Sequence, residues 1–191
     1  MNDEPTIATD YCTLAPGHPW HGPYHDQEYG FPAIEDHVLF ERLVLEINQA
    51  GLSWLTILKK RNHFRQAYDN FDVDRVAAYD EAERRRLLSD KGIIRNRLKV
   101  NAAIVNAQKL VEFREQYGSF RSWLMADHAG LDRRKLASWV KLFKSNFKFV
   151  GPEIVNEFLM STGYLAGAHR TDCPVYTSIL KLEPDWLRWA D

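Results

Sequence analysis

The chain has 191 residues, of which 45% are hydrophobic, and its formal net charge is −1. This length is enough for one domain or for two small lobes that share a core. The near-neutral charge excludes a protein that coats nucleic acid through its bulk charge, so any contact with DNA must depend on a local basic patch. No signal peptide and no apolar run of membrane-spanning length is visible, which predicts a cytoplasmic protein without a membrane segment.

Apolar residues recur with a helical period through most of the chain, and no alternating stretch indicates a strand, so the predicted class is all-α. Residues 1–34 are rich in Pro, Gly, His and Tyr and are expected to form an ordered but irregular N-terminal arm. Residues 35–163 are expected to form a helical body, and residues 164–191 a C-terminal segment, all within a single domain. Most of the six Trp, eight Tyr and ten Phe side chains should lie in the core.

Capping residues divide the helical body. Gly51 should end a helix that runs through Leu39–Ile47, and Ser53 is placed to cap the next helix. Asp80 with Glu83 resembles a capping box. The pattern then predicts one long helix over Ile94–Tyr117, shorter helices over Ser119–Ala126 and Asp132–Lys144, and a further helix that begins at Pro152 and ends near Gly163.

The two cysteines lie near opposite ends of the chain, and each has a histidine partner. Cys12 precedes His25, and His169 precedes Cys173 by four positions. Cys2His2 is a normal ligand set for a closed structural zinc site, which would tie the arm to the C-terminal segment. Spacing alone leaves an accidental arrangement open, whereas a disulfide is a weak expectation in a reducing cytosol.

Residues 91–99 suit a hairpin between two helices that grips DNA phosphate without reading sequence. Gly92 would allow a tight turn, and the N–H groups at the next helix start, near Ile94, suit an anion. The surrounding cations are Lys91, Arg95, Arg97 and Lys99, and the track could extend to Lys59, Lys60, Arg61 and Arg65 and to Lys141, Lys144 and Lys148. A solvated helix end is the alternative interpretation.

Glu46 stands among apolar residues, directly after Leu43, Val44 and Leu45. A buried carboxylate is costly without a partner, so this position is a candidate for receiving N–H donors of an electron-poor base. Trp54 could stack on that base and Tyr24 could add a hydroxyl contact. The alternatives are a surface glutamate on an amphipathic helix and a tryptophan that only packs in the core.

Taken together, these segments resemble the DNA-3-methyladenine glycosylase I (Tag) family of the helix-hairpin-helix superfamily. The matching segments are Tyr24-His25-Asp26-x-Glu28-x-Gly30, Leu45-Glu46, Gln49-Ala50-Gly51-Leu52-Ser53-Trp54, Gly92-Ile93-Ile94-Arg95-x-Arg97, Phe147-Lys148-Phe149-Val150-Gly151 and His169-x-x-x-Cys173. The resemblance implies a helix-hairpin-helix glycosylase fold and one structural zinc held by Cys12, His25, His169 and Cys173. It also implies a base pocket with Glu46, Tyr24 and Trp54, and Leu52 near the gap left by the flipped nucleotide.

The implied activity is hydrolysis of the bond between 3-methyladenine and its sugar in double-stranded, alkylated DNA by a monomeric, monofunctional enzyme. No aspartate lies between Asp90 and Asp127, so the chain lacks the catalytic Asp that many helix-hairpin-helix glycosylases place after the hairpin. It also departs from the family pattern, because Leu14, His21 and Tyr29 occupy positions where the family has other aromatic residues. A DNA-binding module with weak or altered base excision is therefore the alternative.

Overall fold

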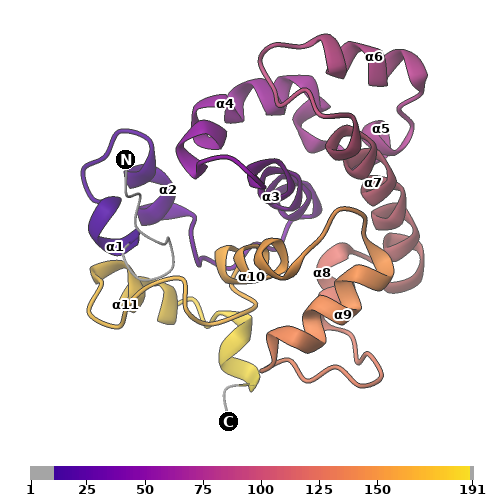
Figure 1. Ribbon diagram of the computed structural model, residues 1–191. Coiled ribbons are helices and arrows are strands. Elements are labelled where there is room, and N and C mark those ends of the chain that lie inside the picture. Colours follow the sequence, from indigo (N-terminus) through magenta and orange to yellow (C-terminus); the bar gives the residue numbers. More distant parts are fainter. Residues whose placement is uncertain (1–10, 190–191) are drawn as a thin grey trace. The chain divides into compact units, whose positions relative to one another are not determined.

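The computed structural model describes residues 11–189, and every regular element in that range is a helix (Figure 1). This confirms the all-α prediction. The elements are α1 (Tyr11–Leu14), α2 (His21–Gln27), α3 (Asp36–Gln49), α4 (Trp54–Ala67), η1 (Asp69–Phe71), α5 (Val73–Ala77), α6 (Glu81–Ser89), α7 (Arg97–Tyr117), α8 (Phe120–Met125), α9 (Leu136–Asn146), α10 (Pro152–Ser161), α11 (Pro174–Leu180) and η2 (Asp185–Trp189). Within the described range, none of these helices has the length and apolarity that crossing a membrane requires.

The chain divides into two compact units. The terminal unit combines the N-terminal residues up to Pro32 with the C-terminal residues from Leu159, and the central unit comprises Ala33–Phe158. The terminal unit contains α1 and α2, so the N-terminal arm includes helices that the prediction of an irregular arm did not identify. Tyr11 explains the order, because its ring lies edge-on to those of Tyr24 and Tyr29. Helices held by such ring contacts lack the periodic spacing of apolar residues from which a helix is predicted in a sequence. The predicted single domain, with segment boundaries after residues 34 and 163, stays a prediction.

Helix α3 is the central element of its unit and contacts α4, α5, α7 and α8 (Figure 1). Every residue from Leu39 to Asn48 is buried. A helix that is surrounded on all sides buries its charged residues as well as its apolar ones, and this is what places Glu46 in the interior. The predicted helix boundary is confirmed, because Gly51 has φ +82° and the Ser53 side chain accepts the Thr56 N–H.

Other caps fix the remaining helix starts. The Asp80 side chain caps α6 as predicted. Helix α7 begins at Arg97 rather than Ile94, because the Asn96 side chain accepts two N–H groups of its first turn. Helix α9 begins at Leu136 rather than Asp132, since the Asp132 carboxylate accepts the Arg134 N–H and holds a turn there. The predictions for α8 and for Pro152 at the start of α10 are confirmed within a residue or two.

Aromatic rings fill the core of the central unit around α7, α8 and α9. Trp123 stacks on Phe113 with ring centroids 4.3 Å apart and also contacts Phe143 and Phe147. The largest fully buried side chains of the described chain include Trp123, Trp139 and eight Phe or Tyr residues. The expectation that most aromatic residues serve the core is thus confirmed, and this packing gives the central unit a rigid scaffold for its loops.

Candidate functional site

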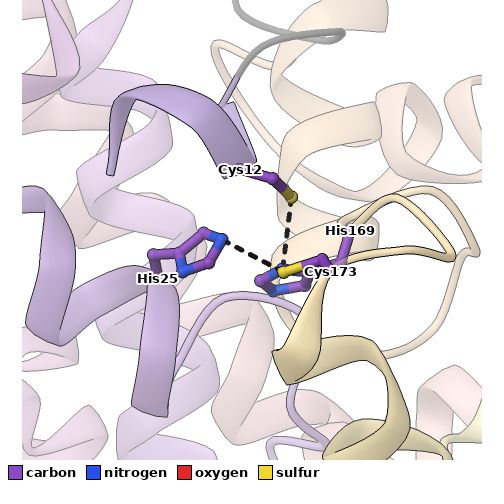
Figure 2. Close-up of side chains that lie close together, drawn as sticks. All are labelled: Cys12, His25, His169 and Cys173. Atoms are coloured by element: carbon purple, nitrogen blue, oxygen red, sulfur yellow. Dashed lines mark hydrogen bonds between the residues drawn. The ribbon is translucent and has the colours of Figure 1, made fainter. Parts of the chain in front are cut away.

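Four predicted metal ligands meet in the terminal unit (Figure 2). The ligand atoms of Cys12, His25, His169 and Cys173 all lie within 4.8 Å of one another. Cys12 comes from α1 and His25 from α2, while His169 and Cys173 come from the loop that precedes α11. The predicted tie between the two ends of the chain is therefore present in the fold.

The separations fit a tetrahedral ion. Sγ of Cys173 lies 3.5 Å from Nδ1 of His169 and 3.7 Å from Nε2 of His25, and Sγ of Cys12 lies 3.6 Å from Nδ1 of His169. A tetrahedron with zinc–nitrogen and zinc–sulfur bonds of ordinary length has edges of about 3.3–3.8 Å. Three of the six separations among the four atoms thus match the edges of such a tetrahedron.

Neighbouring groups orient both imidazoles toward that point. Nδ1 of His25 lies 2.6 Å from an Asp26 carboxylate oxygen, and Nε2 of His169 lies 2.7 Å from the Tyr29 carbonyl oxygen. Each of these nitrogens donates its proton outward, so the lone pair of the other nitrogen faces the cysteines. Burial lowers the pKa of His169, which favours the neutral imidazole that a metal requires. Burial also raises the pKa of the Cys12 thiol, so its thiolate needs a cation to stabilise it.

Glu46 lies in α3 of the central unit and is 4% exposed. The surface-glutamate alternative is therefore wrong. Burial, followed by the negative charge of Glu157, raises the pKa of Glu46 well above its usual range, and only Arg42 acts in the opposite direction. Among the described residues, none forms a hydrogen bond with the Glu46 carboxyl group. A buried acid with so little compensation is a feature of ligand-binding sites rather than of structural ion pairs.

The predicted base-contacting aromatics lie in different units. Trp54 is the first residue of α4, directly after the Ser53 cap, and is 7% exposed. Leu52 lies in the same α3–α4 turn and is 40% exposed, as expected for a side chain presented to DNA. Tyr24 is buried in the terminal unit against Tyr11 and Tyr29. That Tyr24, Glu46 and Trp54 line one base pocket stays a prediction.

The predicted hairpin joins α6 to α7. Arg95 and Arg97 are exposed, and the structure records no hydrogen bond from the backbone N–H groups of Ile94 and Arg95 to any described residue. The reason for Gly92 differs from the expected one, because its backbone is not in the left-handed region. An added Cβ would lie 3.0 Å from the His63 side chain. A larger residue at this position would require the His63 side chain on α4 to shift by a few tenths of an ångström.

Lys99 and Lys60 have structural roles instead of the predicted phosphate contacts, as does Arg61, which is buried and pairs with Glu41. The Lys99 ammonium is buried and donates to the carbonyl oxygens of Asn48 and Ala50, at 2.9 and 2.7 Å. Lys60 donates to the carbonyl oxygens of Lys91 and Gly92 and so holds the hairpin. The assignment of Lys99 to DNA binding is thus corrected, because its charge already satisfies the open end of α3.

Residues that depart from the family pattern are placed as follows. Leu14 is 51% exposed at the end of α1. His21 is buried, with Nδ1 3.2 Å from the Tyr11 hydroxyl. Tyr29 is buried, and its ring lies 5.5 Å from that of His169. His21 and Tyr29 therefore pack within the terminal unit, and Tyr29 supports a metal ligand.

Comparison with known proteins decides the family. The sequence profile of the methyladenine glycosylase family matches residues 15–138. The chain belongs to this family. It is 36% identical over 168 residues to DNA-3-methyladenine glycosylase 1 of Escherichia coli (strain K12). That match covers 80% of this chain and 89% of the E. coli protein. It is 32% identical over 170 residues to the DNA-3-methyladenine glycosylase of Haemophilus influenzae, over 81% of this chain and 91% of that one.

Solved structures of methyladenine glycosylases share the fold. A structure of 3-methyladenine DNA glycosylase I from Staphylococcus aureus, which addresses how 3-methyladenine is recognised, matches with a TM-score of 0.76 and 32% identity. The match covers 88% of this chain and 97% of that one. This agreement confirms the family and the all-helical fold that the sequence motifs indicated.

Sequence reasoning missed the residues that influence the metal ligand His25 and the buried acid Glu46. Asp26 orients His25, and its position directly after the histidine in the Tyr24-His25-Asp26 motif could have indicated this. Arg42 precedes Glu46 by one helical turn, so its influence could also have been anticipated. Glu157 lies 111 positions after Glu46 in the sequence, and nothing local connects the two.

Proposed function

We propose that the protein is a monofunctional DNA-3-methyladenine glycosylase. It extrudes the damaged nucleotide from double-stranded alkylated DNA, hydrolyses the bond between base and sugar, and leaves an abasic site. The observation that carries this proposal is the buried, poorly compensated carboxyl group of Glu46 in a chain of the methyladenine glycosylase family. Relatives named as 3-methyladenine glycosylases over most of the chain support the same activity.

The chemistry follows from the charge of the substrate. Methylation at N3 makes adenine cationic, which already weakens its bond to deoxyribose. Because burial and Glu157 disfavour a negative charge at Glu46, a neutral base offers little compensation, whereas a cationic base restores the missing countercharge. Glu46 would thus favour the damaged base over adenine and offset the positive charge that grows on the sugar. Water completes the hydrolysis, and Trp54 and Tyr24 are proposed to hold the released base.

Contacts with the DNA backbone are proposed for the α6–α7 hairpin. The exposed cations Arg95 and Arg97 and the N–H groups near Gly92 and Ile94 would bind phosphate without reading sequence. Leu52, exposed in the α3–α4 turn, would occupy the gap in the base stack. Together these side chains would position the duplex so that the flipped nucleotide reaches Glu46.

A zinc ion is proposed as the resident metal, held by Cys12, His25, His169 and Cys173. Two thiolates and two imidazoles are a donor set that zinc prefers, and four protein ligands leave no open position for a substrate. Zinc would supply structural stabilisation only, by holding α1, α2 and the loop before α11 together. A monomeric state and a cytoplasmic location stay predictions.

The test is release of 3-methyladenine from alkylated duplex DNA by the parent and by Glu46→Gln. Removing the carboxylate should slow release by about 100-fold, the loss typical of one electrostatic group at a reacting centre. Glu112→Gln is the matched control, because Glu112 is an exposed residue on α7 that forms a surface ion pair with Lys109. Release by Glu46→Gln at the parental rate would contradict the role of Glu46.

The Leu14→Trp variant distinguishes the proposed enzyme from a DNA-binding module with weak or altered base excision. If the exposed Leu14 limits excision, the tryptophan should increase release by the variant relative to the parent. A parent that binds alkylated duplex but releases no base would favour the binding module.

A further inference from the structure

The candidate metal site is open on one side. A cavity of about 450 Å³ lies in the terminal unit, and Cys12, His25 and Cys173 belong to its wall. The surroundings of a metal site control which molecules reach its ligands, and a cavity of this volume is large enough for a small solute. Both cysteines are therefore within reach of small reagents dissolved in the surrounding water.

The two sulfur atoms differ in exposure but lie close together (Figure 2). Cys12 is half-buried, whereas Cys173 is 5% exposed. Their Sγ atoms lie within 4.8 Å of each other, so they need to approach by less than about 3 Å to reach the disulfide bond length of about 2.0 Å. An accessible thiol with a second thiol beside it is the arrangement of an oxidation-sensitive cysteine and its resolving partner.

Arg170 links the chain segments of the two cysteines without the help of an ion. Its guanidinium donates to the Thr13 hydroxyl oxygen at 2.9 Å and to an Asp172 carboxylate oxygen at 3.0 Å. Thr13 directly follows Cys12, and Asp172 directly precedes Cys173. The Arg170 carbonyl oxygen also accepts the Cys173 N–H at 3.0 Å. These contacts keep the two sulfurs close whether or not a metal ion lies between them.

A bound metal ion would keep both thiols in the form that reacts. A thiol that coordinates a metal is deprotonated, and the thiolate rather than the thiol is the nucleophile. Disulfides that form in a reducing compartment are mostly transient and redox-sensing rather than structural. The cavity, the half-buried sulfur and the nearby second sulfur thus provide access, a nucleophile and a resolving group at one place.

We propose that Cys12 and Cys173 form an oxidation site for hydroperoxides, which enter through the cavity and convert the two thiolates into a disulfide. The inference rests on the proposed zinc ligand set and is independent of the proposed glycosylase activity. Oxidation would remove two of the four ligands, so the metal would leave. The tie between the two ends of the chain would then consist of one covalent S–S bond that a reductant can break.

The reaction has two steps. The Cys12 thiolate attacks one oxygen of hydrogen peroxide, the O–O bond breaks, a sulfenic acid forms and hydroxide leaves. The Cys173 thiolate then attacks the sulfur of the sulfenic acid, which forms the S–S bond and displaces a second hydroxide. Two protons from the solvent convert the hydroxides to water. The two sulfurs lose two electrons and the peroxide gains them. Because a thiolate is the form that binds metal, His25 and His169 are the only two of the four ligands that remain.

The test treats the zinc-loaded protein with hydrogen peroxide and follows zinc released to a colorimetric chelator together with the mass of the intact chain. One equivalent of zinc should leave for each disulfide formed, and the chain should lose the mass of two hydrogen atoms relative to its reduced form. Peptide mapping should locate the bond between Cys12 and Cys173, and dithiothreitol with added zinc should restore the metal content. Retention of zinc with both thiols reduced would overturn the proposal, as would oxidation of Cys12 to a sulfinic acid without a disulfide.

Two positions on α11 test entry through the cavity. Val175 belongs to the cavity wall, whereas Thr177 is an exposed residue of the same helix outside that wall. Val175→Trp should fill the cavity and slow both zinc release and disulfide formation, whereas Thr177→Trp should leave both at the parental rate. Ser178→Trp, which changes an exposed residue of the wall, takes the place of Val175→Trp if the latter lowers the unfolding temperature. Parental oxidation rates in the cavity variants would contradict this route of entry.

The outcomes distinguish this proposal from those on which it rests. If the purified chain holds no zinc but peroxide still closes the Cys12–Cys173 disulfide, the metal assignment fails and the oxidation site stands. If the chain holds zinc and releases 3-methyladenine but peroxide forms no disulfide, the oxidation site fails, whereas the ligand set and the glycosylase activity stand.

Discussion

Replacing Glu41 by Gln should destabilise the central unit more than any single exposed charge change. Glu41 lies on α3 and is 5% exposed. Its two oxygens accept four hydrogen bonds from α4, at 2.9 and 3.0 Å from Arg61 and at 2.7 and 3.1 Å from Arg65. This double fork fixes the angle between the helix that carries Glu46 and the helix that begins at Trp54.

The two arginines contribute unequally. The Arg61 side chain is 10% exposed, so a neutral amide opposite it leaves a buried cation without a countercharge. Breaking such a pair from one side costs about 3 kcal/mol. The Arg65 side chain is 43% exposed and can return to water, so its share is below about 1 kcal/mol. We therefore expect a loss of about 3 kcal/mol in the free energy of unfolding.

Urea-induced unfolding at pH 7 measures this loss, with an unchanged dependence on denaturant as the sign that only stability has changed. Glu81→Gln is the control, because Glu81 forms an exposed pair 3.7 Å from Arg84 and its replacement should leave the midpoint unaltered. A Glu41→Gln variant with the midpoint of the control would refute the structural role of the double fork.

The pH dependence gives a second measure of the same interaction. Burial alone would raise the pKa of Glu41, but the hydrogen bonds and charges of Arg61 and Arg65 outweigh it and lower the pKa below the usual value. The carboxylate thus contributes stability that is complete above the unfolded pKa of about 4.3 and is lost as the pH falls through the lower folded value. The difference between parent and variant should shrink below about pH 4. A difference that stays constant from pH 7 to pH 3 would contradict this assignment.

Two further pairs of substitutions test the assigned roles, one for the cations near the hairpin and one for the proposed metal ligands. Lys99→Met should lower the free energy of unfolding by about 1–3 kcal/mol, because two carbonyl groups lose their donor. It should leave the slope of log DNA affinity against log salt concentration unchanged, whereas Arg97→Ala should reduce that slope by about one. Cys173→Ser should lower both the zinc content measured by mass spectrometry and the thermal unfolding temperature, whereas Asp172→Asn, which changes a neighbour outside the ligand set, should do neither. Full zinc content in Cys173→Ser would refute the proposed ligand set.

The sequence predicted the elements whose cause is local. Helical periodicity identified the class, and side chains that cap their own helix start, such as Ser53 and Asp80, marked two boundaries correctly. Where a cap was overlooked, as at Asn96, the predicted helix began too early. Helices α1 and α2 were missed because their order depends on ring contacts around Tyr11 rather than on an apolar stripe.

Long-range contacts explain the errors at the site. Lys99 belongs to a basic run, and only the fold reveals that its ammonium meets carbonyl groups 49 and 51 positions away. Gly92 lies in a turn as expected, but only the fold reveals that an added Cβ would lie 3.0 Å from the side chain of His63. Residue type and spacing, together with the family resemblance, were enough to predict which four residues meet at the candidate metal site, whereas a cation can serve either a phosphate or a helix end.

Glu41 and Glu46 illustrate how structure separates two acids that look alike in sequence. Both are buried on α3, five positions apart, which places them about 140° apart around the helix axis. The pKa of Glu41 is lowered by two arginines, whereas the pKa of Glu46 is raised by burial and by a second carboxylate. A fold gains nothing from an acid of the second kind, since an apolar residue would pack there at lower cost. Its presence is explained if a positively charged ligand completes the site, and the cationic base of alkylated DNA is such a ligand.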